Sequence, residues 1–583
     1  MRRALCCCVE AITAAARTVT AVSVAAGTLG PGGGCATAPA TAAAAAAPIN
    51  VLQAEIWTGD ASIPRGAAVT WRGGRIGGLA PSGTMIAVDG TAELLPVPPG
   101  AFVVPGLVDA HAHLYGLGQA LMRVDLRGDA RTAAIAAKIA QAHGARPPGD
   151  WILGRAWDQN LWSPPAFPSR QTLDQAAPGR PVWLRRVDGH AGWASSEAMR
   201  LAGVTRATED PPGGRIVRGA DGEPTGVFID RAMELVEKAV PDPSPGEIER
   251  AILLAQDHVL ARGLTGVHEM GITPAVEAVY RRLAAGGRLR VRVYAFMSDS
   301  PAAVARLSAS PPEPPDPEAR FTLAGIKLYV DGALGSRGAA LLGPYADEPA
   351  GRNEGGGLVI TPQARLAEIT TAALRTGWQV AVHAIGDRGN RMVLDAFEQA
   401  LRAVPSARDP RLRIEHAQIL DPGDIPRFAK LGVIASMQPT HATSDMPWVP
   451  ARLGADRVAG VYAWQSLLQS GARLCAGSDF PVELADPVLG LAAAVTRQDG
   501  DGRPEGGWLP AERLSADQAL AAFTTGAAFC GRRETVVGAL RPGALADITV
   551  LDRDITAAAA ADIRKARVLM TIVGGKIEYR RDR

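Results

Sequence analysis

The second half of the chain repeats one pattern, in which an amphipathic helix is followed by a glycine and then by a short apolar strand. Residues 248–262 carry apolar side chains at helical spacing, Gly263 follows, and residues 264–268 form a short apolar run. A glycine directly after a helix supplies a left-handed C-cap, and strands that are apolar on both faces are typical of a parallel sheet covered by helices. The same order recurs at residues 366–383, 425–437 and 464–479.

This pattern predicts an α/β protein whose core is a (β/α)8 TIM barrel, because eight apolar strands alternate with helices. The connection between the first and second strands, about residues 114–245, is far too long for a simple crossover. We therefore expect an inserted subdomain after the first strand, over the mouth of the barrel. The eight predicted strands cover residues 103–108, 265–268, 291–297, 326–330, 380–383, 412–416, 433–437 and 474–476.

Two segments near opposite ends of the chain show a different pattern. Residues 51–102 and 536–583 contain short alternating strands and turns in place of helix–strand units. Two β segments that bracket a barrel would most economically pair with each other, so we expect a small composite β-sandwich. The barrel and its insertion are then expected to occupy residues 103–535.

Composition narrows the function. The chain has 583 residues, and its 61 Lys and Arg against 59 Asp and Glu give a formal net charge of +2. This balance leaves no excess positive charge for counterion release on a polynucleotide, so we expect no nucleic-acid partner. Four of the six cysteines lie before residue 36, and too few remain for a disulfide scaffold in a chain of this length.

The first fifty residues form a signal-like or disordered segment. No charged residue lies between Arg17 and Glu55, and a basic start is followed by a short apolar run and then by small residues. That profile is typical of a secretion signal, and the apolar run is too short for a membrane span, which takes about 20 residues. We expect a periplasmic or secreted protein with no membrane span. The alternatives are a disordered tail or a wrongly chosen start codon on a cytoplasmic protein.

Four of the nine histidines stand where predicted strands end. His111 and His113 follow the apolar run VVPGLVDA and project to the same side at a period of two, while His383 and His416 close two later strands and Asp479 follows the last. The carboxyl ends of barrel strands form the active site, and converging imidazoles with a carboxylate suit a divalent metal, zinc first. A single histidine at a strand end is more often structural, so the prediction depends on the joint placement.

Several motifs, in this order, resemble the amidohydrolase superfamily and, within it, amidohydrolase family 3, the YtcJ-like branch that includes N-substituted formamide deformylases. The resemblance covers nearly everything after residue 50. The motifs are VVPGLVDAHAHLYGLG, GIKLYVDGALGSRGAALLGPY, VAVHAIGDRGN, RIEHAQIL and AGSDFPVE, with WDQNLW and RRVDGHAGWASSEAM in the insertion and GALRPGALADITVLD near the end.

The resemblance implies a set of metal ligands. His111 and His113 would bind the more buried ion, His383 and His416 a second one, and Asp479 would both contact metal and move protons. The expected cofactor is therefore one or two divalent ions per chain, with zinc expected.

Lys327 is implied by the same resemblance to be carboxylated on its amine and to bridge the two ions. It lies in the apolar strand AGIKLYV, where an ammonium is costly. The alternative is a buried lysine paired with a carboxylate such as Asp331.

The expected function is hydrolysis of a non-peptide C–N bond, of the amide or N-formyl type, in a small-molecule substrate. Metal-activated hydroxide would attack the carbonyl, with Asp479 as general base and acid. The same site can support deamination, lactone hydrolysis or isomerisation. A different class, an exported metal- or solute-binding protein, needs no proton shuttle, so the presence of Asp479 argues against it. A homodimer is one assembly left open.

Three residues are candidates for substrate binding. His268 or His190 would stabilise the developing oxyanion, and Trp157 would form part of an apolar wall. The alternatives are a structural role for His190 and core packing of the insertion for its tryptophans, Trp157, Trp162 and Trp193.

Overall fold

The computed structural model describes most of the chain after residue 47. Residues 1–47, which make up nearly all of the predicted export segment, are outside the described residues. Asn160 and Asp230 are described by their backbone alone. The described residues are 48–84, 92–145, 147, 149–187, 189, 191–211, 214–314, 316–335, 337–347 and 356–582.

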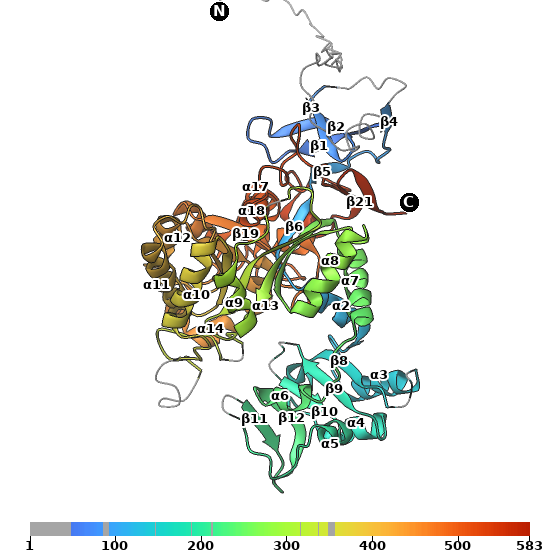
Figure 1. Ribbon diagram of the computed structural model, residues 1–583. Helices are drawn as coiled ribbons and strands as arrows, with labels where there is room; N and C mark the ends of the chain where they lie inside the picture. The colour runs from blue at the N-terminus through green and yellow to red at the C-terminus, as the bar shows by residue number, and fades with distance from the viewer. Residues whose placement is uncertain are drawn as a thin grey trace, which may run out of the picture.

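Eight parallel strands follow one another around a barrel in chain order (Figure 1). Each strand pairs in parallel with the next, from β6 through to β19. The predicted α/β fold with a TIM barrel is therefore confirmed. The strands are β6 (Leu107–Ala112), β13 (Leu264–Ile272), β14 (Arg292–Ser298), β15 (Phe321–Tyr329), β16 (Gln379–Ala384), β17 (Arg413–His416), β18 (Ile434–Met437) and β19 (Arg473–Ala476).

The structure corrects the first predicted strand, residues 103–108, which is two strands. β5 (Phe102–Pro105) pairs with strands from both ends of the chain, whereas β6 belongs to the barrel. Both strands are apolar and buried, so hydrophobicity alone does not separate them. The break falls at Gly106, where a Cβ would collide with the side chain of Thr265, directly after Pro105, which has no N–H for a ladder.

The outer helices begin and end close to their predicted bounds. α10 (Gln363–Thr376) and α12 (Ile425–Leu431) end at Gly377 and Gly432, whose φ angles are 91° and 67°, as expected of left-handed caps. The other helices of this layer are α2 (Leu114–Met122), α7 (Pro245–Leu260), α8 (Pro274–Ala285), α9 (Pro301–Ala309), α11 (Asp387–Ala403), α13 (Pro439–Asp445), α14 (Val449–Leu453), α15 (Trp464–Gln469), α16 (Pro487–Thr496), α17 (Ala516–Phe523) and α18 (Thr525–Cys530).

The last barrel strand meets the first through contacts just beyond β19. The N–H of Asp479 donates to the carbonyl of His111 at 2.8 Å, and the Ser478 hydroxyl donates to the Asp109 carboxylate at 2.6 Å. A Cβ on Gly477 would collide with Asp109 and with the backbone of His111, so this approach requires glycine. The seam places Asp479 directly beside His111.

Strands from both ends of the chain form one continuous sheet at one end of the barrel (Figure 1). β20 pairs antiparallel with β5, so the two terminal segments pair with each other as predicted. Arg292 of the barrel donates to Asp547 of this region at 2.6 Å, in a buried ion pair. The further elements are β1 (Ile49–Trp57), β2 (Arg65–Arg72), β3 (Arg75–Pro81), β4 (Ala92–Leu94), β20 (Ile548–Leu551), α19 (Ala560–Ile563), β21 (Val568–Val573) and β22 (Lys576–Arg580).

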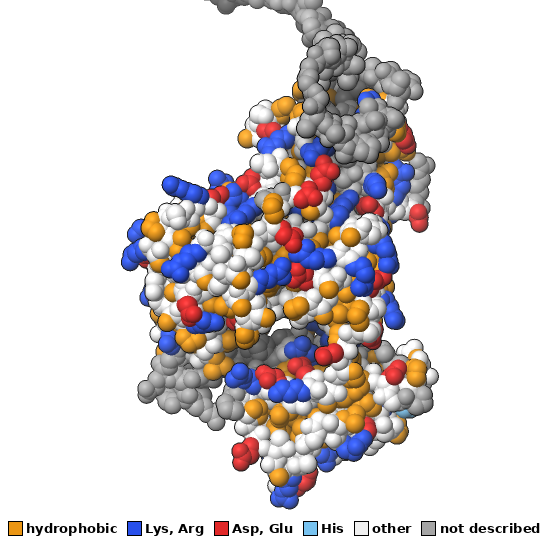
Figure 2. Space-filling view, in the orientation of Figure 1, with side chains coloured by type: hydrophobic (Ala, Val, Ile, Leu, Met, Phe, Trp, Pro, Cys, Tyr) orange, Lys and Arg blue, Asp and Glu red, His pale blue; other side chains and the backbone are white. Residues whose placement is uncertain are grey.

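The insertion is a separate six-stranded sheet with helices at the opposite end of the barrel (Figure 1). The face shown in Figure 2 is hollowed between the barrel and the insertion. The insertion begins at β7 and not at the expected residue 114, because the intervening helix α2 packs on barrel helix α7. The two helices are so close that a Cβ on Gly118 would collide with Ala251. α2 therefore belongs to the outer layer of the barrel. The insertion contains β7 (Val124–Asp125), α3 (Thr132–Gly144), β8 (Ile152–Trp157), α4 (Arg170–Ala176), β9 (Val182–Arg186), β10 (Ala191–Ala194), α5 (Ser196–Leu201), β11 (Gly214–Arg218), β12 (Pro224–Asp230) and α6 (Met233–Glu237).

One disulfide, Cys475–Cys530, joins β19 to the end of α18. This bridge was not predicted from the sequence. Across the residues that the structure describes, no helix is both long and apolar enough to cross a membrane.

Candidate active site

Polar side chains from five barrel strands meet at the carboxyl ends of those strands, on the side from which the insertion leaves the barrel (Figure 1). β6 carries His111, β16 carries His383 and β17 ends at His416, while Asp479 follows β19 and Lys327 lies near the end of β15. Parallel strands bring their carboxyl ends to one edge. Residues separated by hundreds of positions therefore become neighbours.

Three of these side chains are placed to share one ion. His111, His416 and Asp479 are buried, and each offers a ligand atom that lies within 4.8 Å of the other two. The Nε2 atom of His113 lies 3.0 Å from Oδ1 of Asp479, and the ring centroid of His383 lies 4.6 Å from that of His416. The structure thus brings together the four predicted histidines and the predicted carboxylate.

The backbone at two of these positions is strained. His416 and Asp479 have φ angles of 72° and 58°, in the left-handed region that costs a residue with a Cβ about 1–2 kcal/mol. Such outliers persist where the surrounding structure imposes them, and they cluster at functional sites. Here the strain turns both side chains toward the common centre.

Hydrogen bonds fix which ring nitrogen of two histidines is free. Nδ1 of His111 donates to Oε2 of Glu415 at 2.6 Å, and Nδ1 of His416 donates to Oε1 of Gln438 at 2.8 Å. Because both acceptors are oxygens without a proton, each Nδ1 carries the hydrogen and each Nε2 keeps its lone pair. Within the described part of the chain, Nε2 of His111 and Nε2 of His383 are buried without a hydrogen-bond partner.

The electrostatics of the site keep the imidazoles neutral. Burial, and then the charge of Lys327, lower the pKa of His111 to about 4 and that of His383 to about 3. Burial also acts to raise the pKa of Asp479, but His111 and His113 outweigh it and hold that pKa well below its ordinary value. At neutral pH the imidazoles of His111 and His383 are therefore uncharged, and the carboxylate of Asp479 is ionised.

These properties fit a divalent ion. A buried polar atom in an ordinary core has a hydrogen-bond partner, whereas the free nitrogens of His111 and His383 have none among the described residues. Metal ligation requires neutral imidazole and ionised carboxylate, which are the forms that the site favours. The residues present therefore suit a metal.

Lys327 lies in the same layer. Its side chain is 1% exposed, and Nζ lies 4.6 Å from the ring centroid of Tyr329. The alternative partner, Asp331, is occupied elsewhere, and among the described residues Lys327 forms no ion pair with a carboxylate. The Asp331 carboxylate accepts hydrogen bonds from the backbone N–H groups of Ala340, Ile385 and Gly386.

The structure corrects the expected substrate contact of His268, which lies inside the barrel. Its Nδ1 accepts a hydrogen bond from Arg413 at 2.8 Å, and Arg413 also donates to Glu415 at 2.7 Å. On the other side of the ring, a Cβ on Gly531 would lie 2.8 Å from Nε2. His268 is therefore packed against protein on both sides, at the far end of a chain of contacts that leads through Glu415 to His111.

Trp157 is also placed differently from the expectation. Its side chain is fully buried in the core of the insertion, its Nε1 donates to the carbonyl of Leu184 at 2.8 Å, and its ring stacks on Trp162. An apolar wall for substrate needs an exposed face, so Trp157 is a core residue. His190, the third candidate, lies outside the described residues.

Sequence reasoning missed three residues that shape the site. Glu415 orients His111; Glu269 is buried and accepts the N–H groups of Leu114 and Tyr115 at the start of α2. His441 of α13 stacks on His416 at 5.9 Å, with Nε2 3.8 Å from Oδ2 of Asp479. Each had a signal in the sequence, because a charged residue within an apolar strand or a histidine just past one is costly without a role.

Comparisons with known proteins agree with this geometry. The model of the amidohydrolase family matches residues 99–579. The chain is 36% identical to Protein LONG AFTER FAR-RED 3 of Arabidopsis thaliana, over 91% of both chains. It is 34% identical to the putative amidohydrolase YtcJ of Bacillus subtilis, over 82% of this chain and 89% of that one. It is 30% identical to the N-substituted formamide deformylase of Arthrobacter pascens, over 91% and 98%.

A solved structure supports the same assignment. An uncharacterized metal-dependent hydrolase from Pyrococcus horikoshii superposes with a TM-score of 0.72 at 27% identity, over 88% of this chain and 99% of that one. The barrel and its ligand set thus define a metal-dependent hydrolase. The chain belongs to the amidohydrolase family, and the predicted resemblance to its YtcJ-like branch is confirmed.

Proposed function

We propose that this protein hydrolyses a non-peptide C–N bond, of the amide or N-formyl type, in a small molecule. One observation supports this proposal most strongly. At the carboxyl ends of the barrel strands, neutral imidazole nitrogens without hydrogen-bond partners lie next to one ionised, buried carboxylate. The similarity to an N-substituted formamide deformylase supports an N-formyl amine as the first substrate class to examine.

His111, His113, His383, His416 and Asp479 would hold one or two divalent ions, and we propose zinc. Imidazole nitrogen and carboxylate oxygen are ligands that zinc accepts readily. When bound, such an ion lowers the pKa of water to about 7 and polarises a carbonyl.

We further propose that Lys327 is carboxylated. A buried ammonium beside three imidazoles and without a carboxylate partner is unfavourable. The ammonium first loses one proton, and reaction of the neutral amine with CO2 then forms a carbamate and releases a second proton, so that a negative charge replaces the positive one. That carbamate would then be a further ligand and would allow a second ion to bind.

Asp479 is positioned to move the proton. Its Oδ1 lies 3.0 Å from His113 Nε2, and its ionised state at neutral pH makes it a base. It would accept a proton from the attacking water and deliver it to the departing nitrogen, so that the amine leaves uncharged and the carboxylate is regenerated.

Other reactions remain alternatives for the same residues. Deamination, lactone hydrolysis and isomerisation need the same ligands and base. A protein that only stores a metal or a solute does not need a base such as Asp479, held in a strained backbone conformation beside the ligands. We therefore favour catalysis over storage.

The proposal is tested by incubating the metal-loaded protein with a panel of N-formyl and N-acyl amines, lactones and aminated heterocycles. We expect release of amine together with formate or another acid, loss of turnover after chelation, and recovery on adding zinc. Turnover of lactones or heterocycles alone would replace the C–N amide assignment. Metal binding without turnover of any compound would favour the storage function.

We also propose that the protein acts in an oxidising compartment, such as the periplasm. The Cys475–Cys530 disulfide supports this location, because such bonds persist outside the reducing cytosol. Fractionation of the native host should recover the protein with the periplasmic or secreted fraction, and recovery only from the cytosol would overturn the proposal.

A further inference from the structure

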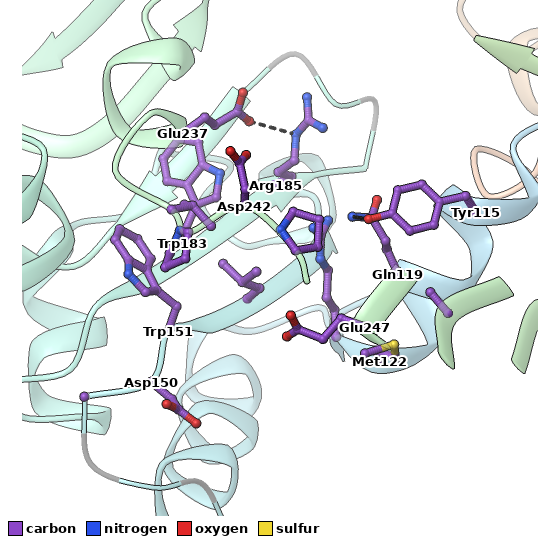
Figure 3. Close-up of a pocket in the computed structure, with 17 residues that line it drawn as sticks. Tyr115, Gln119, Met122, Asp150, Trp151, Trp183, Arg185, Glu237, Asp242 and Glu247 are labelled. Carbon is purple, nitrogen blue, oxygen red and sulfur yellow. Dashed lines mark hydrogen bonds and ion pairs between the residues drawn. The ribbon is translucent and has the colours of Figure 1, made fainter. Parts of the chain in front are cut away.

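A cavity lies outside the metal centre, between the insertion and the barrel. Its volume is about 580 Å3, within the range of roughly 300–1,000 Å3 typical of small-molecule sites. Figure 3 shows Trp151 and Trp183 of the insertion on one side and Tyr115, Gln119 and Met122 of α2 on the other. Sites of this kind often form between two structural units.

The two walls offer different chemistry. Trp151 is half-buried, and its indole ring offers flat apolar surface to the cavity, which favours stacking with a planar group. Trp183 also lines the cavity, but it is only 4% exposed. On the opposite wall, the Gln119 side chain donates to the Tyr115 hydroxyl at 2.9 Å, so the hydroxyl hydrogen is free to reach into the cavity.

The charges of the cavity leave one cation without a partner. The guanidinium of Arg123, which lines the cavity at the end of α2, makes no hydrogen bond or ion pair with any described residue. Arg185 differs, because its Nε lies 3.3 Å from Oε1 of Glu237 (Figure 3). Desolvation, and then the charge of Arg185, lower the pKa of Arg123, as expected of a cation that lacks a compensating anion.

The acidic residues of the cavity do not fill that role. Glu247 is held by Ser244, whose N–H and hydroxyl both donate to it at 2.8 Å. Asp150 and Asp242 also line the cavity but are exposed, and neither forms an ion pair with Arg123. A further arginine, Arg155, lies near Arg123, and its guanidinium likewise makes no hydrogen bond or ion pair with another described residue; burial lowers its pKa to about 10. Of the two arginines that line the cavity, Arg185 is paired with Glu237, whereas the guanidinium of Arg123 has no carboxylate partner among the described residues.

We propose that this cavity binds a small organic anion that carries a flat apolar group, with its carboxylate on Arg123 and its ring against Trp151. Arginine recognises a carboxylate through two parallel N–H donors. The site is separate from the metal ligands, and the proposal does not depend on the reaction proposed above.

The test measures binding of phenylacetate to the metal-loaded protein by titration calorimetry. We expect saturable binding to the wild type. In Arg123→Gln, the loss of a charge-assisted hydrogen bond should weaken binding by about ten-fold or more. Arg131→Gln is the matched control, because Arg131 is an exposed arginine of the insertion that does not line the cavity, and it should bind as the wild type does. The neutral analogue 2-phenylethanol should bind at least about ten-fold more weakly than phenylacetate.

Phenylacetate could instead bind through the metal, and Arg123→Gln distinguishes the two places, since Arg123 is not a metal ligand. Equal binding to the wild type and to Arg123→Gln, or no saturable binding to the wild type, would overturn the proposal. If Arg123→Gln does not fold, a crystal of the wild type soaked in phenylacetate decides the question. Density beside Arg123 supports the site, whereas density only at the metal ligands, or nowhere, contradicts it.

Discussion

Two groups of buried polar side chains inside the barrel differ in how fully their hydrogen-bonding atoms are paired. In the upper group, at the carboxyl ends of the strands, His111 and His383 each keep a ring nitrogen without a hydrogen-bond partner among the described residues, beside the ionised Asp479. In the lower group, His268, Arg413 and Glu415 satisfy one another, since Arg413 alone donates to both of the others.

This difference in hydrogen bonding distinguishes residues that bind a ligand from residues that orient neighbouring side chains. An unpaired buried atom costs free energy unless a ligand completes it, so the upper group is built for an ion. The lower group is complete without a ligand and serves to orient His111 through Glu415. Each of the following variants breaks one side of this comparison.

The largest effect is expected for Asp479→Asn in the upper group. The substitution keeps the size of the side chain and removes the base, so turnover should fall by at least roughly 100-fold, with metal content largely retained. Asp456→Asn, at an exposed aspartate, is the matched control. Full activity of Asp479→Asn would mean that another group moves the proton, with His441 as the nearest candidate.

Glu415→Gln should weaken metal binding by about 10- to 100-fold, the usual cost of losing the partner that orients a ligating histidine. The measurement is competition with a chromogenic chelator. Unchanged affinity would show that the contact between Glu415 and His111 does not orient the imidazole.

His268→Leu should destabilise the fold without affecting the metal. It removes an acceptor from the buried Arg413, which costs about 1–3 kcal/mol in the free energy of unfolding. Denaturant unfolding measures this cost, and elemental analysis should show wild-type metal content. A loss of turnover in a variant with full metal content would return His268 to the catalytic machinery.

Trp157→Phe should have a smaller effect, confined to the insertion. The variant keeps an aromatic ring but loses the hydrogen bond to Leu184, worth about 1 kcal/mol. Michaelis–Menten kinetics should be unchanged. A raised KM would mean that Trp157 contacts substrate after all.

The smallest effect is expected when the pH is lowered and metal content is measured. An ordinary histidine becomes protonated as the pH falls below about 6.5 and can then no longer ligate. Burial shifts the pKa of His111 to about 4 and that of His383 to about 3, so the neutral, ligating form persists as pH falls from 8 to 5. Metal content after dialysis should therefore be constant over that range, and release near pH 6.5 would indicate exposed, ordinary histidines.

Much of the fold could be predicted from the sequence, because the helix–glycine–strand order is a local signal that barrel packing reinforces. The terminal strands were harder to divide. β5 and β6 are equally apolar, and only the contact of Gly106 with Thr265 shows where one sheet ends and the next begins.

The upper group of the site was predictable because its members stand at strand ends, where carboxyl edges converge. The lower group was not, because a histidine inside a strand has the same sequence signal whether it faces a ligand or, like His268, an arginine. Trp157 shows the same limit, since an aromatic residue suits a pocket wall and a core equally well. The cavity beside Arg123 arises from packing between the insertion and α2, and no local pattern encodes it.

Metal content tests the central claim most directly. Protein produced with supplemented zinc, then desalted, should contain one to two divalent ions per chain by elemental analysis, and His111→Ala with His416→Ala should contain none. The absence of a divalent ion from the folded wild-type protein, or an unchanged content in the double variant, would contradict the account.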